Sequence, residues 1–109
     1  AFGMVGLEHA ASVAQEVLIE SGASDWQRFT EVMSSKPAEI GSLEGHGTIA
    51  EGQPANLVLL DPAASRTVTA VTHSLSHNNP FAGRELKGRV LHTVFRGKFS
   101  VKDGKVKNA

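Results

Sequence analysis

The sequence has 109 residues and a mass of 11.5 kDa, which is room for one small domain or part of a larger one. It contains no cysteine, which excludes disulfides and cysteine-ligated metal sites. Eleven basic and eleven acidic residues balance, and no apolar run approaches the ~20 residues of a membrane span. We therefore expect neither nucleic acid nor a membrane as a partner. A (β/α)8 barrel, which needs about 250 residues, cannot fit.

The balanced charge hides a division along the chain. Residues 1–61 carry nine acidic and two basic side chains, whereas residues 62–109 carry two acidic and nine basic ones. The two parts therefore have net charges of −7 and +7. No aromatic pair is interleaved with the basic residues, so the pattern favours two layers with different solvated faces over a nucleic-acid-binding tail.

The first part of the chain has helical periodicity. Residues 7–18 predict an amphipathic helix that ends with Gly22 at the C′ position. Ser24 or Asp25 then caps a second helix, which we expect to stop before Pro37. Pro37 opens a short third helix, ended by Gly41. In the first helix, the predicted polar side carries Glu8, His9, Ser12, Gln15, Glu16 and Glu20, with His9 exposed, and the predicted buried stripe is Leu7, Ala10, Ala11, Ala14, Val17 and Leu18.

The second part has strand patterns. A buried strand is predicted at 57–60, a second strand at 67–72 and a long loop at 73–88. Residues 89–95 and 98–101 predict a hairpin with Gly97 at a positive-φ position, and a turn at 103–104 leads to a short last strand. Helices followed by antiparallel strands are typical of an α+β fold. The first helix has little to pack against in this chain, so we expect further sequence to complete the fold.

The residues of this chain do not compose a complete active site. His73 and His77 are four apart, as in some zinc sites, but they lie in a poor helix without a nearby carboxylate, which favours ordinary loop histidines. There is no His-x-His pair, no Gly-x-Ser-x-Gly and no phosphate-binding glycine loop. We therefore predict no catalytic residue and no metal ligand. The stretch 78–83 predicts a structured loop in which Phe81 is an apolar anchor.

Several motifs nevertheless resemble one family in order and spacing. The segment Phe2-Gly3-Met4-Val5-Gly6-Leu7-Glu8 looks like the one that follows the catalytic aspartate loop of bacterial dihydroorotases. Residues 35–41 (Ser-Lys-Pro-Ala-Glu-Ile-Gly) and 47–58 (Gly-Thr-Ile-Ala-Glu-Gly-Gln-Pro-Ala-Asn-Leu-Val) resemble late motifs of the amidohydrolase superfamily. The pattern Ser76-x-Asn78-x-Pro80-Phe81-x-Gly83 is similar to the dihydroorotase C-terminus. Two departures are Asn56, where the superfamily usually has Asp, and His9, where dihydroorotases often have Thr.

This resemblance implies that residues outside this chain complete both its fold and its site. Residues 1–47 would be the last outer helices of a (β/α)8 barrel whose core is absent from this chain. Residues 48–109 would be the C-terminal strands of a small β-sandwich built from both chain ends. The resemblance assigns substrate contact to the backbone of Phe2 and Gly3. It implies one or two zinc ions in the parent enzyme, with every ligand upstream of Ala1.

The implied activity is that of the whole parent enzyme. A dihydroorotase interconverts dihydroorotate and N-carbamoyl-L-aspartate in pyrimidine biosynthesis, in the cytoplasm, and we expect this chain alone to be inactive and free of zinc. The alternatives are another cyclic amidohydrolase (a hydantoinase or allantoinase), a non-catalytic scaffold for aspartate carbamoyltransferase, and a free-standing interaction module that uses its basic part. A homodimer also stays open.

Overall fold

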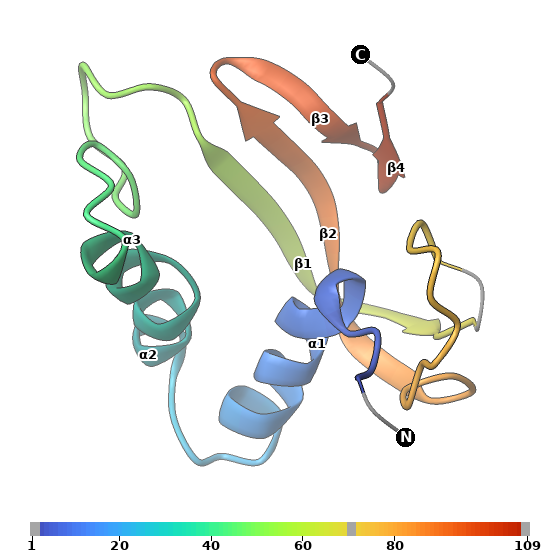
Figure 1. Cartoon of the computed structure of the whole chain (residues 1–109). Helices are drawn as coiled ribbons and strands as arrows, with labels where there is room; N and C mark the ends of the chain where they lie inside the picture. Colours follow the sequence, from blue (N-terminus) through green and yellow to red (C-terminus); the bar gives the residue numbers. More distant parts are fainter. Residues whose placement is uncertain (1–2, 70–71, 108–109) are drawn as a thin grey trace.

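Helices come first in the chain and a four-stranded sheet follows (Figure 1). The computed structural model describes residues 3–69 and 72–107. Its first helical segment comprises η1 (Leu7–His9), α1 (Ala10–Gln15) and the wider π-turn η2 (Glu16–Glu20). The second comprises α2 (Trp26–Thr30), the π-turn η3 (Glu31–Ser35) and α3 (Lys36–Ile40). The predicted α+β order is confirmed, and no described helix is long and apolar enough to cross a membrane.

Both predicted helix ends around Gly22 and Asp25 are confirmed. Gly22 has a φ of 75° and its N–H donates to the Ile19 carbonyl at 3.0 Å, as a C′ residue does. Asp25 is the N-cap of α2, because its side chain accepts a hydrogen bond from the Arg28 N–H at 2.9 Å. The chain therefore turns sharply between the two helical segments.

The predicted stop before Pro37 is wrong. Ser35 and Lys36 both have helical dihedral angles, so α3 continues directly from η3. Pro37 is the second residue of α3 and follows a π-turn, in which the backbone hydrogen bonds are already displaced from the α-helical pattern, so its missing N–H breaks no regular turn. Gly41 ends the helix as predicted, and Ser42 then takes the left-handed position with φ 53°.

The face of the first helix that meets the sheet is the opposite of the predicted one. His9, Ser12 and Gln15 are buried, whereas Leu7 is 92% exposed. The Ser12 hydroxyl donates to the Gly88 carbonyl at 2.5 Å, and Gln15 Nε2 donates to the Pro62 carbonyl at 2.8 Å. Periodicity identifies an apolar stripe but not the layer that covers it. Here carbonyls of two irregular strands satisfy the polar side, and the apolar side faces outward.

The sheet consists of β1 (Leu57–Thr67), β2 (Glu85–Phe95), β3 (Lys98–Lys102) and β4 (Lys105–Val106). The strands are antiparallel and lie in the order β1-β2-β3-β4. The β2–β3 hairpin is confirmed, and its turn has positive φ angles at both Arg96 and Gly97. The turn at Asp103-Gly104 is confirmed in the same way.

The first strand is longer than predicted and is not buried, since Val58 and Leu59 are 60% and 57% exposed. The separate strand at 67–72 is wrong over its described residues after Thr67, and the loop predicted at 73–88 ends earlier, because β2 begins at Glu85. Asp61-Pro62 does not end β1, because an irregularity between Asp61 and Ser65 absorbs the proline. The Asp61 side chain accepts from the Ala63 N–H at 2.9 Å, which satisfies a donor that the ladder loses. The strand then resumes, and Thr67 pairs with Glu85 at the start of β2.

The described part of the chain has a small core. Its buried hydrophobic residues are Val5, Ala38, Val68 and Leu86. The exposed surface is 7963 Å², whereas a folded monomer of this mass exposes about 5800 Å². Ion pairs between layers do not replace this core, since Glu16–Arg84 at 2.5 Å and Glu20–Lys87 at 3.7 Å both lie at the surface. They do show that acidic residues of the first helical segment face basic residues in and just before β2.

Candidate functional site

The segment for which the resemblance implies substrate contact begins outside the described residues. Phe2 lies outside them, and Gly3 is the first described residue. Gly3 is exposed and has a φ of 77°, a conformation that glycine adopts without strain. Its carbonyl accepts a hydrogen bond from the side-chain amide of Asn78. The Gly3 peptide is thus fastened to a loop 75 residues further along the chain.

A second hydrogen bond fastens the same segment. The Val5 N–H donates to the Asn78 carbonyl at 2.8 Å. Val5 itself is 8% exposed, so the segment is anchored in the small core as well as to the loop. Sequence reasoning singled out the Asn78 loop as structured but gave no reason to pair it with Gly3. Asn78 and Gly3 are 75 residues apart, so no local sequence pattern indicates that they are in contact.

His9 lies at the centre of the contact between this segment and the loop. The prediction that it is exposed is wrong: it is 3% exposed, because β1 and the loop close over it. Its Nδ1 lies 3.1 Å from a guanidinium nitrogen of Arg66, and its Nε2 lies 3.2 Å from the amide nitrogen of Asn79. The guanidinium and the Asn79 amide nitrogen are both donors, so a neutral imidazole accepts a hydrogen bond from one of them and not from both. Phe81 places its ring 6.1 Å away, edge to face, which confirms Phe81 as the loop's anchor.

The charges around His9 disfavour its protonation. Burial and the neighbouring Arg66 lower the pKa of His9 below its ordinary value, and the Glu8 carboxylate opposes them only in part. Partial burial raises the pKa of Glu8, but hydrogen bonds from the His73 backbone and ring outweigh burial and lower the pKa below its ordinary value. His9 is therefore suited to a fixed structural contact and Glu8 to a permanent negative charge.

The described residues do not fit a zinc site. His73 and His77 lie in an irregular loop rather than a helix, and His73 contacts Glu8. In residues 3–69 and 72–107, no three side chains of histidine, aspartate or glutamate converge where a metal ion could be held. The donor set for the zinc that the resemblance implies is thus not present in this part of the protein.

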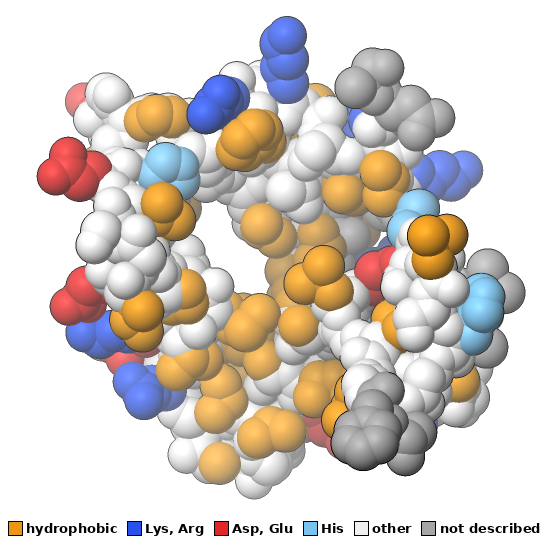
Figure 2. Space-filling view, in the orientation of Figure 1, with side chains coloured by type: hydrophobic (Ala, Val, Ile, Leu, Met, Phe, Trp, Pro, Cys, Tyr) orange, Lys and Arg blue, Asp and Glu red, His pale blue; other side chains and the backbone are white. Residues whose placement is uncertain are grey.

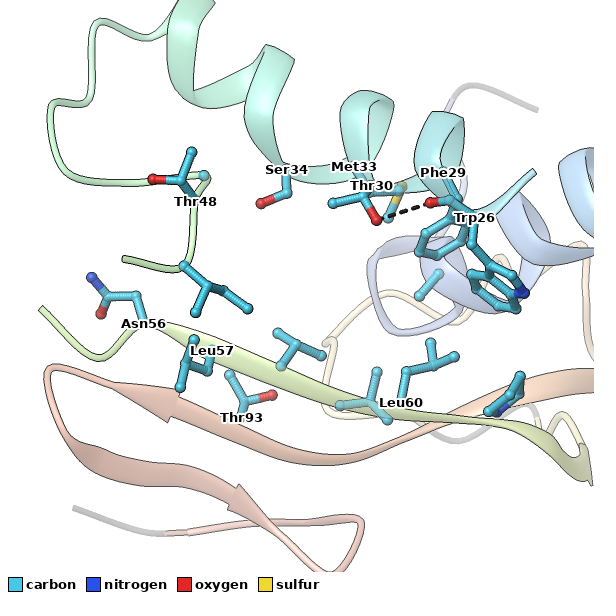
Figure 3. A pocket seen from close by; sticks show the side chains of 16 residues that line it. Trp26, Phe29, Thr30, Met33, Ser34, Thr48, Asn56, Leu57, Leu60 and Thr93 are labelled. Carbon is cyan, nitrogen blue, oxygen red and sulfur yellow. Dashed lines mark hydrogen bonds between the residues drawn. The ribbon is translucent and has the colours of Figure 1, made fainter. Parts of the chain in front are cut away.

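A hollow of about 850 Å³ separates the second helical segment from the sheet. Figure 2 shows the molecule hollowed at its centre with hydrophobic side chains around the opening. In Figure 3, Trp26, Phe29 and Met33 lie on the helical side of the hollow and Leu57 and Leu60 on the strand side. None of the side chains that line it is ionisable. The hollow therefore offers apolar packing surface and no acid–base chemistry.

The outward side of the first helix offers a second apolar surface. It forms a shallow groove whose lining residues are Met4, Gly6, Ala10, Val13, Ala14, Val17, Leu18 and Phe81. This groove contains most of the stripe that the sequence predicted to be buried. Two apolar surfaces are thus uncovered in a chain with a small core.

Sequence comparison relates the chain to dihydroorotases. It is 50% identical over 108 residues to the dihydroorotase of Streptomyces coelicolor and 46% identical over 108 residues to that of Leifsonia xyli. It is 41% identical over 107 residues to the dihydroorotase of Mycobacterium tuberculosis. These matches cover 96–97% of this chain, but the chain spans only about a quarter of the relatives' length. No protein-family model matches the chain.

Structural comparison relates it to hydantoinases. The L-hydantoinase (dihydropyrimidinase) from Arthrobacter aurescens matches 97% of this chain with a TM-score of 0.83 and 31% identity, over 24% of its own length. The D-hydantoinase from a Thermus species matches 91% with a TM-score of 0.82 and 32% identity, over 22% of its length. The chain therefore has the fold of a portion of a cyclic amidohydrolase. Within that class it is homologous in sequence to dihydroorotases.

Proposed function

We propose that the chain is the C-terminal portion of a dihydroorotase, the zinc-dependent hydrolase that interconverts dihydroorotate and N-carbamoyl-L-aspartate in pyrimidine biosynthesis. The observation that carries this proposal is 50% identity over 97% of the chain to a dihydroorotase. Identity to the two hydantoinases described above is 31–32%, which favours dihydroorotate over hydantoins as the substrate of the whole protein. We place the whole enzyme in the cytoplasm.

In the architecture proposed for the whole protein, other residues would cover the two apolar surfaces that this chain leaves exposed. Residues 1–47 would lie on the outside of a (β/α)8 barrel, and residues 48–109 would contribute strands to a β-sandwich. The groove on the first helix and the central hollow would then be covered by barrel and sandwich residues that this chain does not span. An 11-residue strand, β1, lies at one edge of the sheet and could pair with a strand of the missing sandwich part.

In this proposal the chain contributes to substrate binding and not to bond cleavage. The backbone of Phe2 and Gly3 would contact the substrate, and a glycine allows the close approach that such contact needs. The zinc ions would activate water in the whole enzyme, held by residues outside this chain. The chain by itself would then bind no zinc and hydrolyse nothing.

The second candidate function is that of a hydantoinase, which the structural similarity favours. A chimera separates the two. The matching segment of the Streptomyces coelicolor dihydroorotase is replaced by residues 1–109, and hydrolysis of dihydroorotate and of hydantoin is measured. We expect activity on dihydroorotate within about tenfold of the unaltered enzyme and little on hydantoin. A folded, zinc-loaded chimera that is inactive on dihydroorotate refutes the proposed function, and a preference for hydantoin supports the second candidate.

A further inference from the structure

One residue makes two hydrogen bonds across the gap between the N-terminal segment and the distant loop. Asn78 donates from its side chain to the Gly3 carbonyl and accepts from the Val5 N–H through its backbone carbonyl at 2.8 Å. The two bonds hold the segment on both sides of Met4. Figure 1 shows the N-terminal segment and the loop that contains Asn78 lying side by side.

The loop that presents Asn78 is itself held firmly. The side chain of Asn79 accepts from the Phe81 N–H at 3.0 Å, and its amide group donates to the Thr69 carbonyl at 3.3 Å. Phe81 packs against His9, and a Cβ on Gly6 would lie 3.8 Å from its ring. The loop thus rests on the start of the first helix, and Asn78 is presented from a supported turn rather than from a free loop.

Gly3 needs such a restraint. With a φ of 77° and no side chain, its peptide has more conformational freedom than that of any other residue type. A Cβ built at Gly3 would meet nothing within 4 Å, so neighbouring atoms do not confine it sterically. Hydrogen bonds are what fix the orientation of its carbonyl, and hence of the peptide plane.

We propose that Asn78 is a positioning residue for substrate binding, which orients the Gly3 peptide through its side-chain amide. This inference rests on the proposed function, because it takes the Gly3 backbone as a substrate contact. Asn78 itself touches no substrate. It acts by restricting a flexible glycine to the conformation that binds, so that binding does not have to order the segment.

The test uses the dihydroorotase chimera and four substitutions. Asn78→Asp keeps the shape of the side chain but has no N–H to donate, Asn78→Ala removes the side chain without adding charge, and Asn78→Gln retains a donor. None of the three removes the backbone bond to Val5. Asn56→Asp is the matched control, since it makes the same chemical change at the far end of β1. The two substituted positions are exposed (Asn78) and partly exposed (Asn56), so we expect the variants to fold.

We expect N78D and N78A to raise the KM for dihydroorotate about tenfold while kcat changes less than twofold. N78Q should recover at least a third of the loss, and N56D should leave both constants unchanged. Hydrogen exchange at the Val5 amide should quicken in N78D and N78A. A purely structural role would lower the amount of active enzyme without changing KM.

The outcomes separate this inference from the function on which it rests. An active parent chimera whose KM is the same in N78A and N78D overturns the inference and leaves the proposed function standing. A tenfold KM change in N78D but not in N78A shows charge repulsion and also overturns it. A folded parent chimera with no activity on dihydroorotate refutes the proposed function and this inference together.

Discussion

The contact between the first helix and β2 depends on the absence of a side chain at Gly88. Gly88 has a φ of 88°, and a Cβ built there would lie 2.3 Å from Oε1 and 3.0 Å from Cδ of Gln15. Gln15 is fully buried and donates to the Pro62 carbonyl. Gly88→Ala therefore strains the backbone and displaces a buried amide at the same time.

The expected loss of stability can be worked from these two effects. A left-handed conformation costs a non-glycine residue about 1–2 kcal/mol. Moving the Gln15 side chain breaks a buried hydrogen bond and leaves polar groups unsatisfied, which costs about 1–3 kcal/mol. We expect G88A to lower the free energy of unfolding by about 3 kcal/mol. Gly83→Ala is the matched control, because Gly83 has a φ of 82° and open space around it, and should lose about 1 kcal/mol.

Urea unfolding followed by the fluorescence of the single tryptophan, Trp26, measures both variants. With a slope near 1 kcal/mol per molar, a 2 kcal/mol difference separates the two midpoints by about 2 M. The double variant G88A/Q15A should be less destabilised than the sum of its single variants, since the clash no longer exists. Equal losses in G88A and G83A, or strict additivity in the double variant, would show that the helix does not pack on β2 in this way.

Three further predictions concern polar groups. Asn56 has a buried Nδ2 with no partner among the described residues, while its Oδ1 accepts from the Arg96 N–H. Asn56→Asp puts a charged oxygen at the position of Nδ2 without giving it a partner, so it should lower the stability by about 1–3 kcal/mol in the same urea assay, and an unchanged or higher midpoint would contradict this. Burial lowers the pKa of His9 in the folded chain, so the unfolded chain takes up a proton at this residue first as the pH falls. The free energy of unfolding should therefore decrease from about pH 7 downward until the pKa of the folded state is passed. His9→Gln should flatten that part of a stability–pH curve, and a curve of unchanged slope would contradict this prediction. The exposed ion pair Glu16–Arg84 should contribute little to stability. Glu16→Gln should therefore lower the free energy of unfolding by less than about 0.5 kcal/mol, and by less still in 0.5 M salt. A larger loss that does not depend on salt would contradict this prediction.

Local rules of the sequence predicted the turns well. Gly22, Gly97 and Gly104 all have positive φ angles, and the Asp25 cap forms as expected. In each case the residue's own stereochemistry or a hydrogen bond to the next turn decides the structure. These are short-range effects, so a single sequence is sufficient to predict them.

Long-range packing could not be predicted in the same way. Helical periodicity locates the apolar stripe of the first helix, but it does not show which side of the helix packs on the sheet. His9 and Gln15 became buried because Arg66, Asn79 and the Pro62 carbonyl provide partners from distant parts of the chain. Pro62 lies inside a strand because the Asp61 side chain accepts a hydrogen bond from the Ala63 N–H at the irregularity.

The residues of the candidate site could be predicted from motifs, but the contact between them could not. The resemblance indicated Gly3 and the 78–83 loop separately, from motifs that stand 75 residues apart. Their connection through Asn78 depends on a chain reversal that only the folded structure shows. The uncovered groove and hollow likewise became visible only when the helix orientation was known.

Complementation in trans tests the central claim most directly. The Streptomyces coelicolor dihydroorotase is prepared without the segment that matches this chain, and the 109-residue chain is added to it. We expect that neither part hydrolyses dihydroorotate alone, that the two parts form a complex, and that the complex recovers activity in proportion to the chain added. Hydrolysis by the 109-residue chain alone, or a complex that forms and remains inactive on dihydroorotate, would contradict it.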